Sequence, residues 1–212
     1  MDHKQILLIG DERQAKWHPL GPMRKRLEQI LGGRFRLVAM ESDESWPALL
    51  DSGEFAACIS YADLWKRVPA PRQTAALLKF VAGGGGLLAI HNGISLANAW
   101  ELLQVIGAKF AGHPPSCELH FRRAADDHPI LRGVQNFAMK EEPYRFEFDP
   151  CTPRTLLLEY EYEGKRWPSA WEHRYGLGRV VYFHPGHTAD SLKPEAAQRF
   201  VANSVRWIAG LD

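Results

Sequence analysis

Four short segments of the sequence carry imidazole, carboxylate or phenol groups at positions suited to chemistry. His91 and Asn92 follow a buried apolar run, and His187 follows another such run after a Pro-Gly turn. Two further segments, Gly112-His113-Pro114 and Glu141-Glu142-Pro143-Tyr144, carry side chains of the same types. Such groups can transfer protons as general acids and bases. Three histidines and a glutamate could instead bind a divalent metal ion.

From these segments we derive an expected role for each residue. The expected catalytic groups are His91, His187, Glu142 and Tyr144. The expected substrate-binding groups are Asn92, His113 and Glu141. A metal ion, zinc or manganese, would be bound by His91, His113, Glu142 and His187. The spacings are long and include neither HxH nor HExxH, so a metal-free acid–base site is the open alternative.

The remaining histidines fit ordinary structural positions. His18 precedes a proline at a helix start, and His128 lies in a turn before another proline. His120 falls within a predicted strand, and His173 precedes a predicted hairpin turn. We therefore expect none of these four in the site.

The first half of the chain alternates between strand and helix patterns. Short apolar runs predict strands at Gln5–Gly10, Arg34–Met40, Phe55–Tyr61 and Leu87–Ile90. Helical spacing predicts helices at 20–31, around Trp46–Leu50, at Pro69–Ala82 and at 94–106. Alternation of this kind indicates βαβ units, a parallel sheet and helices on both faces.

In the second half of the chain, strand patterns follow one another without helices between them. Strand patterns occur at Cys117–Arg123, Glu142–Phe148, Thr155–Glu161, Trp167–His173 and Arg179–His184. The last two flank Gly176-Leu177-Gly178 and predict a hairpin that leads into a buried strand. Pro194–Leu211 has the spacing of a closing helix, and no linker or repeat interrupts the chain. We expect a single domain over residues 1–212.

A sharp corner follows the fourth predicted strand. Gly83–Gly86 precede this strand and end the helix before it, whereas a phosphate-binding loop would follow its strand and open a helix. In class I glutamine amidotransferases and related hydrolases, the corner after such a strand presents a Cys or Ser nucleophile. Here His91 occupies it, with Gly93 two residues further on. This argues against an amidotransferase but keeps a site at the corner, because ligands bind beyond the carboxyl ends of parallel strands.

Composition excludes several classes of partner. Lys and Arg number 26 against 25 Asp and Glu, so no basic field favours nucleic acid. Apolar runs are far too short to cross a membrane, and the N-terminal run is too short for a signal-peptide core. Three cysteines without a CxxC motif indicate a reducing compartment. We expect a cytoplasmic protein with no membrane or nucleic-acid partner, and a homodimer on general frequency alone.

Five segments in order resemble the trehalose-utilisation (ThuA-like) family. They are Gly83–Gly93, Gly107–Pro114, Asp126–Gly133, Glu141–Tyr144 and the stretch from Trp171 to His187. The resemblance implies a flavodoxin-like, doubly wound and mostly parallel α/β sheet, related to the class I glutamine amidotransferases but without their cysteine. It also implies a role in the catabolism of disaccharides or keto-sugars, with a small sugar as the partner molecule.

Two residues depart from the family pattern. Ala108 replaces a usual glycine, and Glu141 replaces the usual aspartate, which lengthens the reach of that carboxylate. Because its side chain is longer, Glu141 need not have the role that the aspartate has in the family.

Three functions remain open at this level. The first is an enzyme that isomerises, eliminates from or cleaves a sugar, with Trp17, Trp65 or Trp100 as flat faces for sugar rings. The second is a non-catalytic module that binds a sugar or a metal ion. The third is a hydrolase or amidotransferase that uses Cys117 or Ser95 as nucleophile, although neither occupies the corner.

Overall fold

A computed structural model describes residues 4–13, 15–43 and 46–211. Its main feature is a mixed sheet of nine strands in the order β2-β1-β3-β4-β11-β10-β9-β6-β7. The parallel strands are β1 (Lys4–Gly10), β2 (Phe35–Glu41), β3 (Phe55–Tyr61), β4 (Gly86–Ile90) and β11 (Gly178–Phe183). The antiparallel strands are β10 (Lys165–Tyr175), β9 (Thr155–Tyr162), β6 (Cys117–Arg123) and β7 (Phe137–Glu141). The chain therefore has an α/β fold built on one large mixed sheet.

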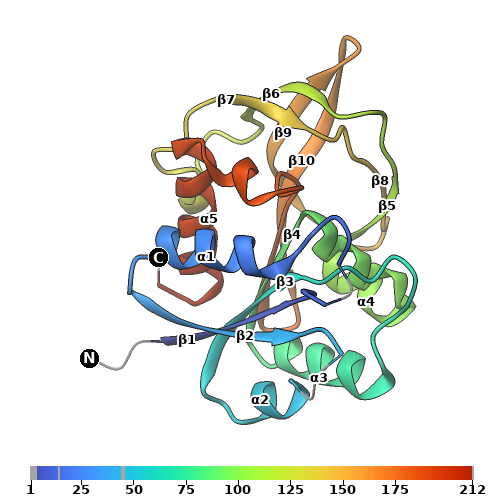
Figure 1. The fold of residues 1–212 in the computed structure, drawn as a ribbon, viewed down its shortest axis with the longest axis vertical. Coiled ribbons are helices and arrows are strands. Elements are labelled where there is room, and N and C mark those ends of the chain that lie inside the picture. The colour runs from blue at the N-terminus through green and yellow to red at the C-terminus, as the bar shows by residue number, and fades with distance from the viewer. Residues whose placement is uncertain (1–3, 14, 44–45, 212) are drawn as a thin grey trace.

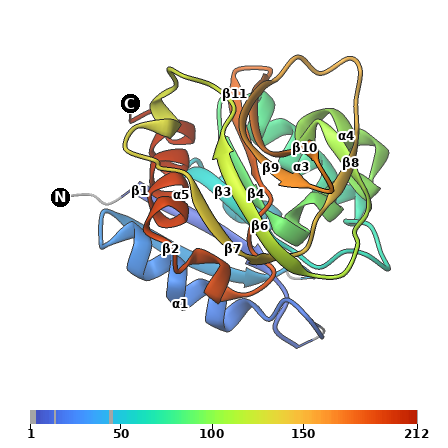
Figure 2. The same cartoon turned by 90° about the horizontal axis from the view of Figure 1, so that it is seen from above.

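Helices cover both faces of the parallel half (Figures 1 and 2). Alternate strand residues point to opposite faces, so Ile6 and Leu8 join one apolar core while Leu7 and Ile9 join the other. Helices α1 (Leu20–Leu31) and α5 (Glu195–Ile208) pack on the first core. Helices α2 (Pro47–Asp51), α3 (Pro71–Ala82) and α4 (Trp100–Ile106) pack on the second. This confirms the predicted strand–helix alternation of the first half.

In the second half of the chain, the sequence analysis did not predict all of the strands. Ala108–Gly112 forms β5, which pairs with β8 (Arg145–Phe148) in a separate two-stranded sheet. The sequence analysis missed both β5 and β7, because each is a five-residue strand with half-exposed residues and no strong pattern. The predicted helix over residues 94–106 is split into a 3₁₀ segment, η1 (His91–Asn98), and α4. Two further 3₁₀ turns are η2 (Pro129–Leu131) and η3 (Ala189–Leu192).

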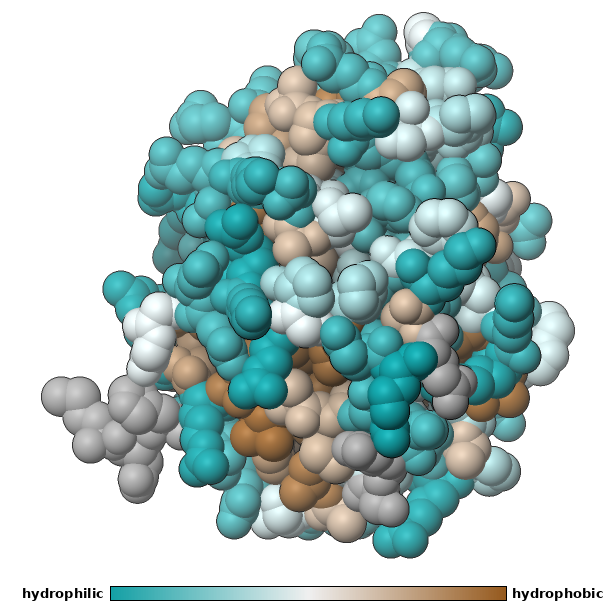
Figure 3. Space-filling model, viewed as in Figure 1, coloured by the Kyte–Doolittle hydropathy of each residue, from teal (hydrophilic) through white to brown (hydrophobic). Residues whose placement is uncertain are grey.

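The face seen in Figure 3 is mainly hydrophilic, with hydrophobic residues gathered in its lower part. Within the residues described, no helix has the length and apolar character needed to span a bilayer. The hydrophilic character of the face in Figure 3 agrees with a sequence that contains 26 Lys and Arg and 25 Asp and Glu residues.

Buried polar groups fasten the end of α4 to the central sheet. The indole Nε1 of Trp171 donates to the carbonyl of Ile106 at 2.9 Å, and His173 Nε2 lies 3.0 Å from the carbonyl of Val105. Since a carbonyl only accepts, His173 Nε2 carries a proton and donates. Burial lowers the pKa of His173, although its bonds to the carbonyls of Gln104 and Val105 act in the opposite sense.

The lowered pKa of His173 predicts a pH dependence of stability. The folded protein binds a proton at His173 less readily than the unfolded chain does. The free energy of unfolding should therefore fall as the pH drops below the ordinary imidazole value of 6.5. We expect His173→Gln to make this decline shallower between about pH 7 and about pH 5. Urea unfolding at a series of pH values measures it, and an identical slope in the variant would contradict the assignment.

Candidate active site at the carboxyl ends of the parallel strands

The site begins at a strained corner after β4. His91 has a φ of 47°, in the left-handed region that residues with a side chain rarely adopt. Two residues on, a Cβ at Gly93 would lie 2.2 Å from the carbonyl oxygen of Ser60, so only glycine fits there. The corner holds the imidazole of His91, which is fully buried, at the carboxyl end of the sheet. The sequence predicted this corner, and the structure has it.

Hydrogen bonds fix the tautomer of His91. Its Nδ1 lies 2.9 Å from the carbonyl oxygen of His184, so Nδ1 carries the proton and donates. In the neutral ring, the lone pair of Nε2 then faces the phenol of Tyr144, whose oxygen is 2.9 Å away and donates to it. Burial raises the pKa of Tyr144 well above its ordinary value, which keeps the phenol neutral.

Glu142 lies among three histidines. Its carboxylate oxygens are 3.4 Å from His91 Nε2, 3.3 Å from His187 Nδ1 and 3.7 Å from His113 Nε2. Burial raises the pKa of Glu142, but His187 and His91, in their protonated forms, outweigh it through hydrogen bonds and charge and lower the pKa overall. The hydrogen bond to Glu142 in turn raises the pKa of His187, against the opposing effect of burial. Glu142 is thus ionised at neutral pH, with His187 as its close partner.

Glu141 points away from the cavity and holds the turn that carries His187. Only 1% exposed, its carboxylate accepts from the backbone N–H groups of Gly186 at 2.9 Å and His187 at 3.3 Å. A Cβ at Gly186 would lie 2.9 Å from that of His91, so the turn passes close to the corner. Glu141, which we expected to bind substrate, is a buried anchor in the structure.

Asn92 and His184 are also buried supports of the corner. The amide of Asn92 donates to the carbonyl of Tyr61 at 2.8 Å, which joins the ends of β3 and β4. His184 Nε2 lies 2.6 Å from the carbonyl of Glu142 and donates to it. Burial lowers the pKa of His184 to about 4, so the ring is neutral. Asn92, like Glu141, does not line the cavity.

His18 belongs to the site, although the sequence analysis placed it elsewhere. Its ring centroid lies 5.1 Å from that of His91 and 5.2 Å from that of His187. Its Nδ1 is 3.1 Å from a carboxylate oxygen of Asp63. Burial lowers the pKa of His18, against the effect of this bond. The sequence signal was the position of His18 in the loop after the first strand, but a histidine before a helix-starting proline is usually a surface residue.

A buried polar cluster joins the loops after β1, β2 and β3. The carboxylate of Asp11 accepts from the Asp63 backbone N–H at 2.7 Å, from the Ser42 hydroxyl at 2.5 Å and from the Arg67 guanidinium at 2.7 Å. Arg67 also donates to Ser42. Asp11, directly after β1, thus fixes the backbone of Asp63.

These groups open onto a cavity of about 440 Å³ with aromatic walls. The residues that line it are Trp17, His18, Trp65, Phe110, His113, Glu142, Tyr144 and His187. Trp17 is 60% exposed at the rim, while Trp65 packs against Phe110 with ring centroids 4.9 Å apart. Trp100 lies outside this cavity, beside a different surface groove. Both the volume and the mixture of aromatic walls with a few polar groups are typical of small-molecule sites.

The proposed nucleophiles of a hydrolase are not available here. The Ser95 hydroxyl donates to the carbonyl of Ala62 and accepts from the N–H of Leu64. Cys117 lies in β6, outside the cavity, and burial raises the pKa of its thiol. Among the described residues that line the cavity, Tyr144 carries the one hydroxyl.

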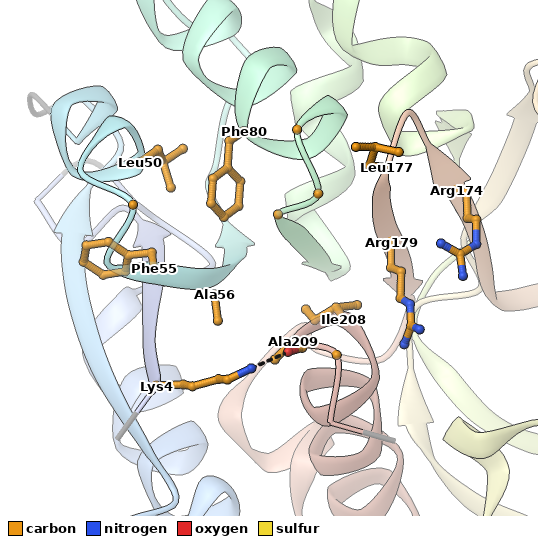
Figure 4. Close-up of a pocket in the computed structure, with 15 residues that line it drawn as sticks. Lys4, Leu50, Phe55, Ala56, Phe80, Arg174, Leu177, Arg179, Ile208 and Ala209 are labelled. Carbon is orange, nitrogen blue, oxygen red and sulfur yellow. Dashed lines mark hydrogen bonds between the residues drawn. The ribbon is translucent and has the colours of Figure 1, made fainter. Parts of the chain in front are cut away.

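A second cavity, of about 530 Å³, lies at the opposite end of the parallel strands (Figure 4). Lys4 donates to the carbonyl of Ala209 at 2.9 Å, and Arg179 donates to that of Trp207 at 2.7 Å. These cations therefore satisfy the last carbonyls of α5, as basic side chains do at helix ends. Its described lining includes none of the side-chain types, histidine, carboxylate and phenol, that gather in the first cavity.

Fold and site together define an α/β protein with a histidine- and glutamate-lined pocket at the carboxyl ends of its parallel strands. The chain belongs to the ThuA family, described as trehalose utilisation, which it matches over residues 27–208. This membership supports a carbohydrate-related role.

Solved structures agree with this family. A ThuA-like protein from Parabacteroides merdae ATCC 43184 has 17% identity and a TM-score of 0.80, and the match covers 98% of this chain and 90% of that one. A ThuA-like protein from Bacteroides uniformis ATCC 8492 has 13% identity and a TM-score of 0.76, with 97% and 91% covered. A cytoplasmic protein from Salmonella typhimurium LT2 has 17% identity and a TM-score of 0.64, with 96% and 99% covered. At these identities the likeness shows the fold alone. No curated protein matches the chain significantly.

The anchoring role of Glu141 can be tested by stability. We expect Glu141→Gln to lower the free energy of unfolding by about 1–3 kcal/mol, because the amide cannot replace a buried carboxylate that accepts several N–H bonds. Glu118→Gln, at a side chain that is 74% exposed, is the matched control and should change it by less than about 0.5 kcal/mol. Equal stability of the two variants in chemical denaturation would show that Glu141 does not anchor the turn.

Proposed function

We propose that this protein is an enzyme of sugar catabolism that moves a proton on a sugar bound in the aromatic pocket. One observation carries the proposal: an ionised carboxylate, Glu142, and a neutral phenol, Tyr144, both line the pocket and both lie within 3.4 Å of His91 Nε2. The sugar-related role of the family supports the choice of substrate class.

A keto-sugar, or another sugar with a carbonyl group, suits this arrangement. Removal of the proton on the carbon next to a carbonyl needs a base and a group that stabilises charge on the carbonyl oxygen. Glu142 takes the proton. The Tyr144 hydroxyl gives up its bond to His91 Nε2 and donates its one hydrogen to the carbonyl oxygen of the bound sugar instead. His91 and His187 hold these two groups in place and keep Glu142 ionised.

The walls of the pocket suit the apolar faces of a sugar ring. Trp17 and Trp65 present flat aromatic surfaces near the rim, and His113 is one-third exposed beside them. We propose that the ring rests against these tryptophans, with His113 near its hydroxyl groups.

We also infer that the chain is one domain with a flavodoxin-like, doubly wound core. The strand order β2-β1-β3-β4-β11 is the order 2-1-3-4-5 of such folds, with helices packed on both faces. The position of the pocket beyond the carboxyl ends of these strands supports the same inference.

Deuterium exchange offers a direct test of the chemistry. The chain is incubated in heavy water with trehalose, sucrose and their 3-keto derivatives, and the carbon-bound hydrogens are followed by proton NMR. We expect exchange at the carbon next to the carbonyl of a keto-sugar, and Glu142→Gln should slow it by roughly 10²–10⁴-fold.

The controls separate catalysis from binding. His120→Ala, at a side chain that is 73% exposed and outside the pocket, should leave the rate unchanged. Thermal stabilisation by a sugar without exchange or turnover would contradict the enzyme and favour a binding module instead. Exchange that persists in Glu142→Gln would exclude this glutamate as the base.

A further inference from the structure

We propose that His18, His91 and His187 bind one divalent transition-metal ion, and that Asp63 is the positioning residue of His18. The proposal deepens the proposed function, since it concerns the same pocket, but its evidence and its test do not depend on sugar turnover.

The three imidazoles converge from separate loops. Each offers one ring nitrogen, and these three atoms lie within 4.8 Å of one another. His18 comes from the loop after β1, His91 from the corner after β4 and His187 from the turn after β11. Three parallel strands therefore end around one point, as expected for a ligand site in such a sheet.

In two of the rings, the nitrogen that would face away from the metal ion has a hydrogen-bond partner, as it usually has in metal-bound histidines. His91 Nδ1 donates to the carbonyl of His184, and His18 Nδ1 pairs with the Asp63 carboxylate. A bond of this kind on one nitrogen orients the ring and leaves the lone pair of the other nitrogen toward the cation. On His18 that lone pair is free, and on His91 the cation would take it in place of the hydrogen bond from the Tyr144 phenol.

His18 supplies the observation that points most directly to a ligand. The residue is only 4% exposed, and its Nε2 has no hydrogen-bond partner among the residues that the structure describes. Buried polar atoms are nearly always paired. A cation between His18, His91 and His187 would supply the partner.

Asp63 is itself fixed in place. Its backbone N–H donates to Asp11, whose carboxylate is held by Ser42 and Arg67. The side chain of Asp63 is 15% exposed, so its bond to His18 is largely shielded from water. The polar cluster thus extends from the loop after β2 to the inner face of the pocket.

The donor set indicates the class of ion. Three imidazoles with a carboxylate nearby suit Zn²⁺ and neighbouring ions such as Co²⁺ and Mn²⁺, whereas Ca²⁺ and Mg²⁺ prefer sites made of oxygen ligands. With three protein ligands, a position stays open for a water molecule or a substrate oxygen. Such an ion can polarise a sugar carbonyl, while Glu142 and Tyr144 handle protons beside it.

His113 is set apart from this group. It was an expected ligand from the sequence, but its ring is one-third exposed on the wall of the pocket. Its Nδ1 is 2.8 Å from the carbonyl of the next residue, Pro114. His113 is therefore the matched control for His18.

The test is a metal titration without any sugar. The full chain is stripped with a chelator and titrated with Zn²⁺ by calorimetry and with Co²⁺ by visible absorption. We expect one ion per chain, loss of affinity by at least about 100-fold in His18→Ala, and no change in His113→Ala. In Asp63→Asn we expect affinity to fall by about 10–100-fold with a shifted Co²⁺ spectrum. The unfolding midpoint of metal-free Asp63→Asn should stay close to that of the metal-free wild type.

The other outcomes overturn the proposal. Absence of binding, or wild-type binding in His18→Ala, would remove the three-histidine site. Wild-type affinity and spectrum in Asp63→Asn would remove its positioning role, and this isosteric variant also serves if His18→Ala does not fold. Deuterium exchange by a chain that binds no metal would overturn this site and leave the proposed function intact. A metal-loaded chain that catalyses no deuterium exchange would overturn the proposed function and leave this metal site intact.

Discussion

The arrangement of the site depends on the hydrogen bond from His91 Nδ1 to the carbonyl of His184. This bond sets which nitrogen of His91 faces the pocket. It forms because β4 and β11 are parallel neighbours in register, with Ile90 opposite Phe183, so that the next residue of each strand lies across the same edge. Both strands are buried on both faces, and their register is thus fixed by two apolar cores.

Two unfavourable features lie next to this bond, the strained backbone of His91 and the buried charge of Glu141, and the surrounding residues compensate for both. The left-handed backbone of His91 is unfavourable by itself, and it persists because Gly93 and Gly186 let neighbouring backbone approach without a Cβ. Burial works against ionisation of Glu141, but the nearby imidazoles of His91 and His184 and the backbone N–H of Gly186 in the turn after β11 outweigh it, and the pKa is lowered overall. The same turn carries His187, so one buried carboxylate positions a side chain that another carboxylate, Glu142, contacts.

Much of the parallel half could be predicted from sequence, because a strand buried on both faces is a short apolar run and its helices have a clear period. The corner at His91 followed from the same pattern. His18 could not be found in this way, since its place in the site depends on Asp63 and Asp11, which come close only after three strands pair. Nor could the sequence separate Glu141 from Glu142. They are adjacent carboxylates, yet one faces the protein interior and the other the pocket.

The antiparallel half of the sheet supplies the groups of the pocket that are not histidines. The parallel strands alone would bring together His18, His91 and His187, which are all imidazoles. Glu142 and Tyr144 come from the connection between β7 and β8, and the phenol of Tyr160 on β9 donates to the Tyr144 carbonyl at 2.6 Å to hold that connection. A carboxylate and a phenol thus reach the histidines only when the second half of the sheet has folded against the first. The two five-residue strands that the sequence concealed, β5 and β7, therefore frame the segment that gives the site its acid–base character.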